Sequence, residues 1–228
     1  YVEACTIESK ATTEPADIKI EVARGGEYKI RLEDGTTVWL NSESSLIYPE
    51  KFTGDKRAVR LSGEGYFEVA RDEKKPFIVS VTDMEIKVLG TKFNVTAYQD
   101  EKMTTTTLIS GAVEVVTPHR SVQLQPGKQA MVQEGGDDIT VLEVDVELAT
   151  SWTAGIFKFD KMALTDICTR LSRWYDIDFV FEGETGKEKF TGGTWKYVPL
   201  KDFLSKIERV TNVLFLFENN TIKVVPKK

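Results

Sequence analysis

The feature that most restricts the fold of this chain is an internal duplication in its last third. A shift of 36 residues superposes the apolar stripe of one amphipathic segment, at 164–174, on that of a second segment, at 200–210. The same shift brings residues 177–181 onto residues 213–217, and both alternate as strands do. Each β-α-β unit is too small to bury an apolar face alone. The duplication therefore predicts two units that pack together as one small α+β domain.

Several residues mark where the elements of this domain begin and end. Asp160 is the expected N-cap of the first helix, and Pro199 is expected at the start of the second, where its missing N–H costs nothing. Cys168 lies on the apolar stripe of the first helix, so it is expected to be a small buried hydrophobe. Residues 222–225 are predicted to add a further strand.

Before residue 160 or so, the dominant pattern is instead a period of two, and its clearest example is the stretch 59–69. One face of this predicted strand is apolar or glycine: Val59, Leu61, Gly63, Gly65, Phe67 and Val69. Two glycines in a Gly-x-Gly pair also suggest a phosphate loop, but that needs a helix N-terminus just downstream, and here the strand pattern continues. We therefore expect Gly63 and Gly65 to form the flat centre of a scaffold strand, with Glu64 and Glu68 facing solvent.

Further short strands follow the same pattern, separated by glycine turns. Asp34-Gly35 between alternating apolar residues predicts a β-hairpin. Apolar positions change parity between Gly90 and Phe93, so a bulge or corner is expected there, and Gly127 marks another turn. Other strands are predicted at 46–48, 77–81, 86–90, 93–97, 103–109, 112–116, 122–124 and 129–132. This pattern is typical of an all-β sandwich, barrel or short solenoid with glycine corners, without helices before about residue 160.

The two patterns divide the chain into segments. Residues 1–23 are expected to be a lead-in or linker, 24–148 an all-β domain, and 149–228 the duplicated β-α-β domain. The distribution of charge also separates the parts, because residues 151–228 carry a net charge of +3 and residues 1–150 carry −9.

Composition narrows the class of protein. A hydrophobic content of 41% and a charged content of 29% are ordinary for a globular protein, and a net charge of −6 argues against nucleic acid as the main partner. No apolar run reaches the length of about 18 residues that a membrane helix needs. The chain begins at Tyr1 without Met, so we expect it to be a piece whose targeting or anchoring segments are missing.

Residues with catalytic or metal-binding chemistry are few and scattered. His119 is the single histidine, in a predicted turn, so neither a zinc site nor a Ser/His/Asp triad can be assembled around it. Cys5 lies far from Cys168 in the sequence and forms no pair motif with it. Asp137 and Asp138 lack the alternating spacing of a calcium loop. We therefore expect no metal, no cofactor and no catalytic residue, and interpret the chain as a binding protein.

One group of aromatic residues is a candidate for partner binding. Phe190, Trp195 and Tyr197 lie on a predicted edge strand of the last domain. The ordinary interpretation is core or cross-strand packing. The sharper one is an aromatic anchor for a partner strand that adds to the sheet.

Several motifs, in a fixed order over residues 24–132, resemble the FecR family of anti-sigma factors. They are Arg24-Gly25-Gly26-Glu27-Tyr28, Leu32-x-Asp34-Gly35-Thr36-x-Val38-Trp39-Leu40-Asn41, Leu46-x-Tyr48-Pro49-x-x-Phe52, Leu61-x-Gly63-Glu64-Gly65-Tyr66-Phe67-Glu68-Val69, Pro76-Phe77-x-Val79 and Val88-x-Gly90-Thr91-x-Phe93-Asn94-Val95. The sequences of these motifs are most similar to those of members from Bacteroidetes, although Gly65 stands where the family commonly has Ala. The duplicated part resembles the small domain that follows in those proteins, which is similar to the secretin/TonB short N-terminal fold.

The resemblance implies the periplasmic part of a single-pass inner-membrane signalling protein without enzyme activity. In such proteins a cytoplasmic segment, outside the residues given, binds an extracytoplasmic-function sigma factor. The periplasmic part receives a signal from an outer-membrane TonB-dependent transporter and thereby controls release of the sigma factor.

Two other classes of function are consistent with the residues alone. A carbohydrate-binding β-sandwich module would use exposed aromatic residues, for which Trp39, Tyr66 and Trp195 are the candidates. A glycoside hydrolase would need a cleft with two carboxylates roughly 5–10 Å apart.

Overall fold

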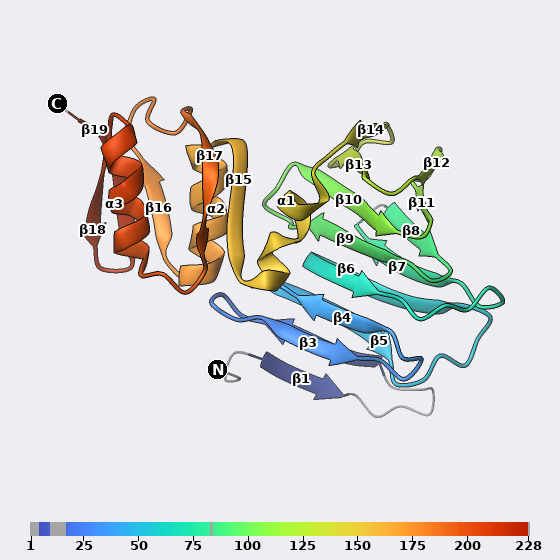
Figure 1. The fold of residues 1–228 in the computed structure, drawn as a ribbon. Coiled ribbons are helices and arrows are strands. Elements are labelled where there is room, and N and C mark those ends of the chain that lie inside the picture. The colour runs from blue at the N-terminus through green and yellow to red at the C-terminus, as the bar shows by residue number, and fades with distance from the viewer. Residues whose placement is uncertain (1–4, 10–16, 83, 228) are drawn as a thin grey trace. The chain divides into compact units, whose positions relative to one another are not determined.

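The computed structural model describes residues 5–9, 17–82 and 84–227 (Figure 1). The chain divides into two compact units, Tyr1–Thr150 and Ser151–Lys228. The first is almost entirely strand and the second contains both strands and helices. A mostly β first part followed by a small α+β part is the arrangement that the two sequence periods predict.

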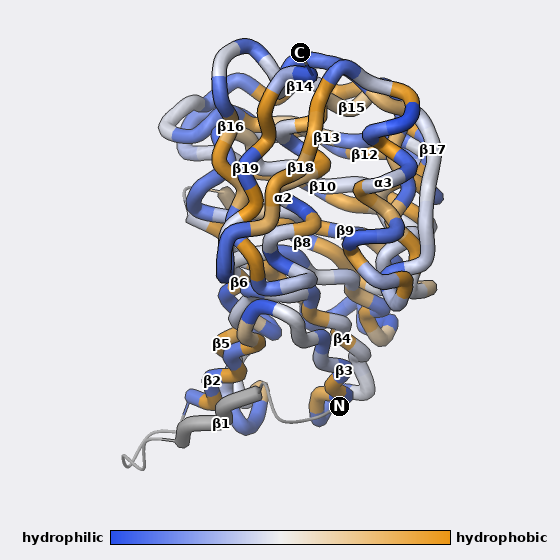
Figure 2. Tube along the Cα trace, turned by 90° about the vertical axis from the view of Figure 1, so that its left-hand side faces the viewer, coloured by the Kyte–Doolittle hydropathy of each residue, from blue (hydrophilic) through white to orange (hydrophobic). Residues whose placement is uncertain are grey.

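Within the residues that the structure describes, the fourteen strands of the first unit form one continuously hydrogen-bonded sheet. The strands are β1 (Cys5–Ser9), β2 (Asp17–Val22), β3 (Tyr28–Arg31), β4 (Thr37–Leu40), β5 (Ser44–Pro49), β6 (Arg57–Glu68), β7 (Phe77–Val81), β8 (Met84–Val88), β9 (Lys92–Ala97), β10 (Met103–Ser110), β11 (Val113–Val116), β12 (Ser121–Leu124), β13 (Lys128–Gln133) and β14 (Ile139–Glu143). Figure 2 shows the alternation of hydrophilic and hydrophobic residues along β2 and β5. This alternation puts one face of each strand in the core.

β6 is the central strand, because it pairs with four other strands: β4, β5, β7 and β9. Its first half, up to Ser62, pairs with β5 on one side and β7 on the other. Its second half, from Gly63, pairs with β4 and β9 instead. The change of neighbours occurs at Gly63, whose φ is +92°. The expected flat centre is therefore a corner, which only a residue without a Cβ adopts easily.

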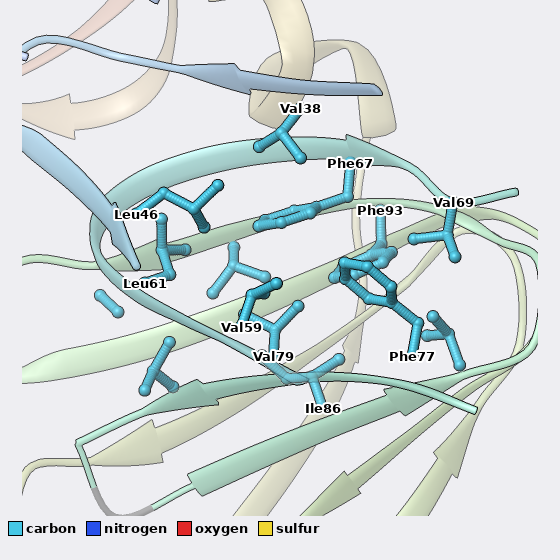
Figure 3. Close-up of a cluster of buried hydrophobic side chains, with 14 of the residues drawn as sticks. Val38, Leu46, Val59, Leu61, Phe67, Val69, Phe77, Val79, Ile86 and Phe93 are labelled. Atoms are coloured by element: carbon cyan, nitrogen blue, oxygen red, sulfur yellow. The ribbon is translucent and has the colours of Figure 1, made fainter. Parts of the chain in front are cut away.

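The core of the first unit lies between the strands that pair with the first half of β6 and those that pair with its second half (Figure 3). Phe67 on the second half of β6 stacks on Phe93 of β9, with ring centroids 5.0 Å apart. It also contacts Phe77 of β7, at 6.4 Å. The apolar face of β6 is buried along its whole length, from Val59 to Phe67. A Cβ on Gly65 would lie 2.9 Å from the Phe67 ring, so glycine leaves room for this stack.

The parity change near Gly90 marks the point where the chain passes from the strands beside the first half of β6 to those beside its second half. β8 pairs with β7 and β11, whereas β9 pairs with β6 and β10. Gly90 permits this crossing because it has no Cβ. A Cβ at this position would lie only 2.7 Å from the Cβ of Arg71. Because β8 and β9 pair with different strands, each keeps its own alternation. Val88 and Phe93 are therefore both buried.

Three features of the first unit differ from the sequence expectations. Asp17–Val22, within the expected lead-in segment, form β2, whose Ile20 is fully buried and which pairs with β5. β14 is an additional strand, and its largely exposed residues lack a clear apolar period. A short helix α1 (Val146–Thr150) and a 3-10 turn η1 (Ser151–Ala154) precede residue 160. Both are too short to produce a helical period in the sequence.

The second unit packs two helices between two small sheets (Figure 1). Its elements are β15 (Ile156–Ala163), α2 (Leu164–Tyr175), β16 (Asp178–Phe181), β17 (Lys189–Trp195), α3 (Leu200–Val210), β18 (Val213–Glu218) and β19 (Thr221–Pro226). β15 and β17 form one sheet, and β16, β19 and β18, in that order, form the other. Both helices contribute to the core, where Phe159 of β15 stacks on Phe203 of α3 at 6.0 Å.

The starts of the two helices are 36 residues apart, as in the duplicated pattern. Asp160 does not cap the first helix: the N-cap is Ala163, without a side-chain hydrogen bond, and Asp160 lies in β15, where it accepts from Thr191. The strand continues three residues further than the sequence suggests, which displaces the helix start. Pro199 is the N-cap of α3.

Candidate partner-binding edge of the second unit

β17 is an edge strand in the part of the chain that the structure describes, because it pairs only with β15. Its second side leaves backbone N–H and C=O groups available for another strand. Close pairing with β15 explains one of its two glycines, since a Cβ on Gly193 would lie 2.7 Å from the carbonyl oxygen of Phe157. The geometry is therefore suited to main-chain pairing with an added strand.

The three aromatic candidates are not equivalent in the structure. Trp195 is 60% exposed and Tyr197 is 75% exposed, unusually high fractions for large aromatic side chains. Phe190, at the other end of β17, is half-buried and packs against the core of the unit, opposite Met162 of β15. Trp195 and Tyr197 thus lie together at one end of the strand, and Phe190 contributes mainly to packing.

Residues 195–198 form a tight turn that joins β17 to α3. The N–H of Val198 donates to the carbonyl of Trp195 at 3.3 Å, and the N–H of Lys196 donates to Gly155 at 2.9 Å. Lys196, between the two exposed aromatic residues, is only 1% exposed. The side chains in this turn therefore alternate outward, inward and outward.

Two residues at the end of α2 hold this turn, a role that the sequence pattern does not predict. Nε1 of Trp174 donates to the carbonyl oxygen of Lys196 at 2.8 Å. The hydroxyl of Tyr175 lies 3.0 Å from the same oxygen and 2.6 Å from that of Val198. Burial raises the pKa of Tyr175, so its hydroxyl stays protonated and able to donate. The pattern placed Trp174 on the apolar stripe but carried no signal for its indole N–H bond across 22 residues.

A second exposed apolar surface lies on the outer face of the other sheet. Leu214 and Leu216 of β18 and Val180 of β16 are each more than a third exposed, and Leu216 and Val180 both flank Lys223 of β19. The alternation in the sequence predicts these strands but does not predict that this face is exposed. It is a useful comparison for the β17 edge, since it offers apolar side chains without an exposed tryptophan.

The aromatic residues of the carbohydrate-binding alternative have other neighbours. Trp39 and Tyr66 meet edge to face at 5.3 Å across β4 and β6. Nζ of Lys29 lies 4.2 Å from the centre of the Trp39 ring. Sugar binding by stacking uses an open ring face, and here a cation already lies over the ring. This arrangement favours a structural role for the pair.

Glu64 differs from the expected solvent-facing carboxylate. It accepts from Asn41 Nδ2 at 2.7 Å, from Asn94 Nδ2 at 3.0 Å and from Thr96 Oγ1 at 3.2 Å. Its two oxygens thus join the end of β4, the middle of β6 and β9. The sequence pattern missed this because Asn94 and Thr96 come from a segment thirty residues later.

The chemistry that an enzyme or metal site would need is dispersed. No group of three or more potential metal ligands occurs among the described residues. A cavity of about 550 Å³ in the first unit has two carboxylates in its lining, Glu73 and Glu114, and Arg71 binds that of Glu73 at 2.5 Å. His119 is exposed and lies 3.7 Å from Asp137, and Cys168 is a buried free thiol. The Glu73 carboxylate is therefore already held in an ion pair, unlike the two carboxylates that flank the scissile bond in glycoside hydrolysis.

The comparisons with known proteins agree on one family. A family model described as "FecR protein" matches residues 18–114, and one described as "FecR, C-terminal" matches residues 156–224. No curated protein matches the chain. Within the described ranges, no helix combines the length and the apolar character required to cross a bilayer.

Two solved structures are similar over nearly the whole chain. Both are crystal structures described as a candidate anti-sigma factor from Parabacteroides distasonis ATCC 8503, at 1.65 and 2.50 Å resolution. The first is 31% identical with a TM-score of 0.85, and the match covers 92% of this chain and 99% of that one. The second is 30% identical with the same TM-score, and the match covers 93% and 100%. The family and these neighbours are regulators and not enzymes. The chain therefore belongs to the FecR family of anti-sigma factors, which act in signal transduction to regulate transcription.

Proposed function

We propose that this chain is the periplasmic, signal-receiving region of a membrane-anchored anti-sigma factor. Regulators of the FecR family are anchored in the membrane and have a periplasmic region, which supports this placement. The signal comes from an outer-membrane TonB-dependent transporter. The regulated partner is an extracytoplasmic-function sigma factor, bound by a cytoplasmic segment outside the residues given.

The second unit is the part that docks the transporter's signalling domain, and the docking mode is addition of a strand to β17. The observation that carries this proposal is an edge strand that ends in two exposed aromatic side chains, Trp195 and Tyr197. Main-chain hydrogen bonds to an added strand supply affinity without a deep pocket. Exposed aromatic residues at its end supply the anchor, since such residues dominate the energetics of many interfaces.

Binding of the isolated chain to recombinant N-terminal signalling domains of the host's TonB-dependent transporters tests the proposal. We expect Trp195→Ala to weaken binding by at least about 2 kcal/mol, as for an interface hot spot. Leu216→Ala on the other exposed apolar surface is the matched control and should bind like the wild type.

Two outcomes would contradict the proposed docking mode. Undiminished binding after removal of residues 151–228 would place the docking surface in the first unit. A larger loss for Leu216→Ala than for Trp195→Ala would transfer docking to the sheet of β16, β19 and β18.

A further inference from the structure

The turn at residues 195–198 reverses the usual relation between side-chain chemistry and burial. Lys196 is 1% exposed, whereas Trp195 and Tyr197 on either side are 60% and 75% exposed. Lysine is almost never fully buried unless its charge is compensated, and large aromatic residues are normally well buried. A shift of the turn by one residue would bury an aromatic side chain and expose the ammonium. Some specific interaction therefore holds the observed arrangement.

The ammonium group of Lys196 lies in a cage of three aromatic rings. Nζ is 4.4 Å from the ring centre of Trp174, 5.5 Å from that of Trp152 and 5.6 Å from that of Phe157. All three distances are within the range of about 6 Å in which a cation is attracted to an aromatic face. Trp152 and Phe157 are buried, which removes competing water from the ammonium. We call these three rings the Lys196 cage.

The backbone of Lys196 is fixed together with its side chain. Its N–H donates to Gly155, and its carbonyl oxygen accepts from Nε1 of Trp174 at 2.8 Å. Trp174 therefore contacts the ammonium with its ring and the carbonyl with its indole N–H. The same ring meets Tyr197 edge to face at 5.8 Å. Holding Lys196 inward thus fixes the directions of its two neighbours.

We infer that Lys196 is a positioning residue, whose ammonium in the Lys196 cage keeps Trp195 and Tyr197 displayed for the partner strand. This inference rests on the proposed docking at β17. A partner binds a pre-formed pair of anchors, so it does not have to order the turn on binding. Conflicts between local preference and structure are expected at functional sites, and the inverted turn is one.

The test uses the whole chain and two measurements on the same variants. The first is hydrogen exchange of the indole N–H of Trp174, followed by NMR, which reports the turn without any partner. The second is affinity for the transporter signalling domain that binds the wild type. Lys196→Ala removes the side chain that enters the Lys196 cage, and Lys196→Met fills the cage without the charge. Lys206→Ala, at an exposed lysine of α3, is the matched control.

We expect Lys196→Ala to accelerate exchange of the Trp174 indole N–H at least tenfold and to weaken partner binding at least tenfold. Lys196→Met should show at least half of each effect on a logarithmic scale, and it supplies the answer if Lys196→Ala does not fold. Lys206→Ala should leave both measurements unchanged. Wild-type exchange in Lys196→Met would overturn the role of the ammonium.

The outcomes separate this inference from the docking proposal. If Trp195→Ala weakens binding while both Lys196 variants bind and exchange like the wild type, the positioning role is wrong and docking at β17 stands. If Trp195→Ala binds normally, docking at β17 is wrong, and slow exchange that depends on Lys196 then supports only an ordered turn.

Discussion

Gly63 lies where β6 passes from one pair of neighbouring strands to the other, with a φ of +92°. A Cβ at this position would lie 2.3 Å from Oγ of Ser44 and 2.7 Å from its Cα. Ser44 cannot easily retreat, because its Oγ accepts the N–H of Glu64 at 2.8 Å. Both the backbone conformation and the close approach therefore require glycine.

Gly63→Ala should consequently be far more destabilising than an ordinary glycine substitution. Left-handed backbone costs about 1–2 kcal/mol for alanine, and overpacking adds about 1–3 kcal/mol. Gly127→Ala is the control, since its φ is +83° but nothing lies within 4 Å of the added Cβ. Urea unfolding should show a loss of roughly 2–5 kcal/mol for Gly63→Ala and about 1–2 kcal/mol for Gly127→Ala. Equal losses would show that the contact with Ser44 relaxes freely.

A pH dependence follows from the buried thiol of Cys168. Burial raises the pKa of this thiol, while in the unfolded chain it ionises at its ordinary value, near 8.5. Above that pH the unfolded state loses a proton that the folded state keeps, so the free energy of unfolding falls as pH rises. The raised pKa of Tyr175, also caused by burial, acts in the same direction above about pH 10.

Replacing the thiol should remove part of this dependence. We expect the free energy of unfolding of the second unit to fall between pH 9 and 10 by about 1.2 kcal/mol less in Cys168→Ala than in the wild type. Urea unfolding at both pH values, followed by tryptophan fluorescence, measures the difference. The same slope in both proteins would mean that the thiol ionises in the folded state.

At the scale of elements, the start of β6 is held by a buried ion pair. Nη1 of Arg57 lies 2.8 Å from Oδ2 of Asp34, in the turn between β3 and β4, and 2.8 Å from the carbonyl oxygen of Ala70. Its Nε donates to Lys75 at 2.9 Å, just before β7. A single guanidinium thus joins the turn between β3 and β4 to the loop between β6 and β7. Its exposure is only a few per cent, so the charge depends on this pairing.

Asp34→Asn should therefore be strongly destabilising, by about 3–5 kcal/mol, because it leaves a buried cation without its counter-charge. Asp17→Asn is the matched control, since its carboxylate pairs with Arg60 at 3.3 Å in an exposed position. Such exposed pairs contribute about 0–1 kcal/mol. Urea unfolding of the two variants gives the comparison. A similar small change in both would show that Arg57 is compensated by its carbonyl contacts alone.

At the scale of the molecule, each unit has a hydrophobic core of its own. The core of the first unit extends from Ile20 to Val132, and that of the second from Phe157 to Val224. A part of a chain with its own core can fold alone. Family membership covers both parts, because separate family models match each of them.

We therefore expect the fragments 1–150 and 151–228 to fold independently. Each should give a cooperative urea transition and a far-UV circular dichroism spectrum that matches its share of the whole chain. The fragment 151–228 should also retain binding to the transporter signalling domain. A fragment that remains unfolded alone would show that its core needs the other unit.

The sequence alone determined the family, the division between a mostly β part and a small α+β part, and the positions of the two long helices. These rest on local periods and ordered motifs, which short windows of sequence carry in full. Tertiary structure decided that Gly63 is a corner, that Glu64 bonds to Asn41 and Asn94, and that Lys196 lies inside while Trp195 and Tyr197 lie outside. Each of these depends on which distant segment becomes a neighbour. Alternation in a sequence says that two faces differ, but the contacts across twenty or more residues decide what each face meets.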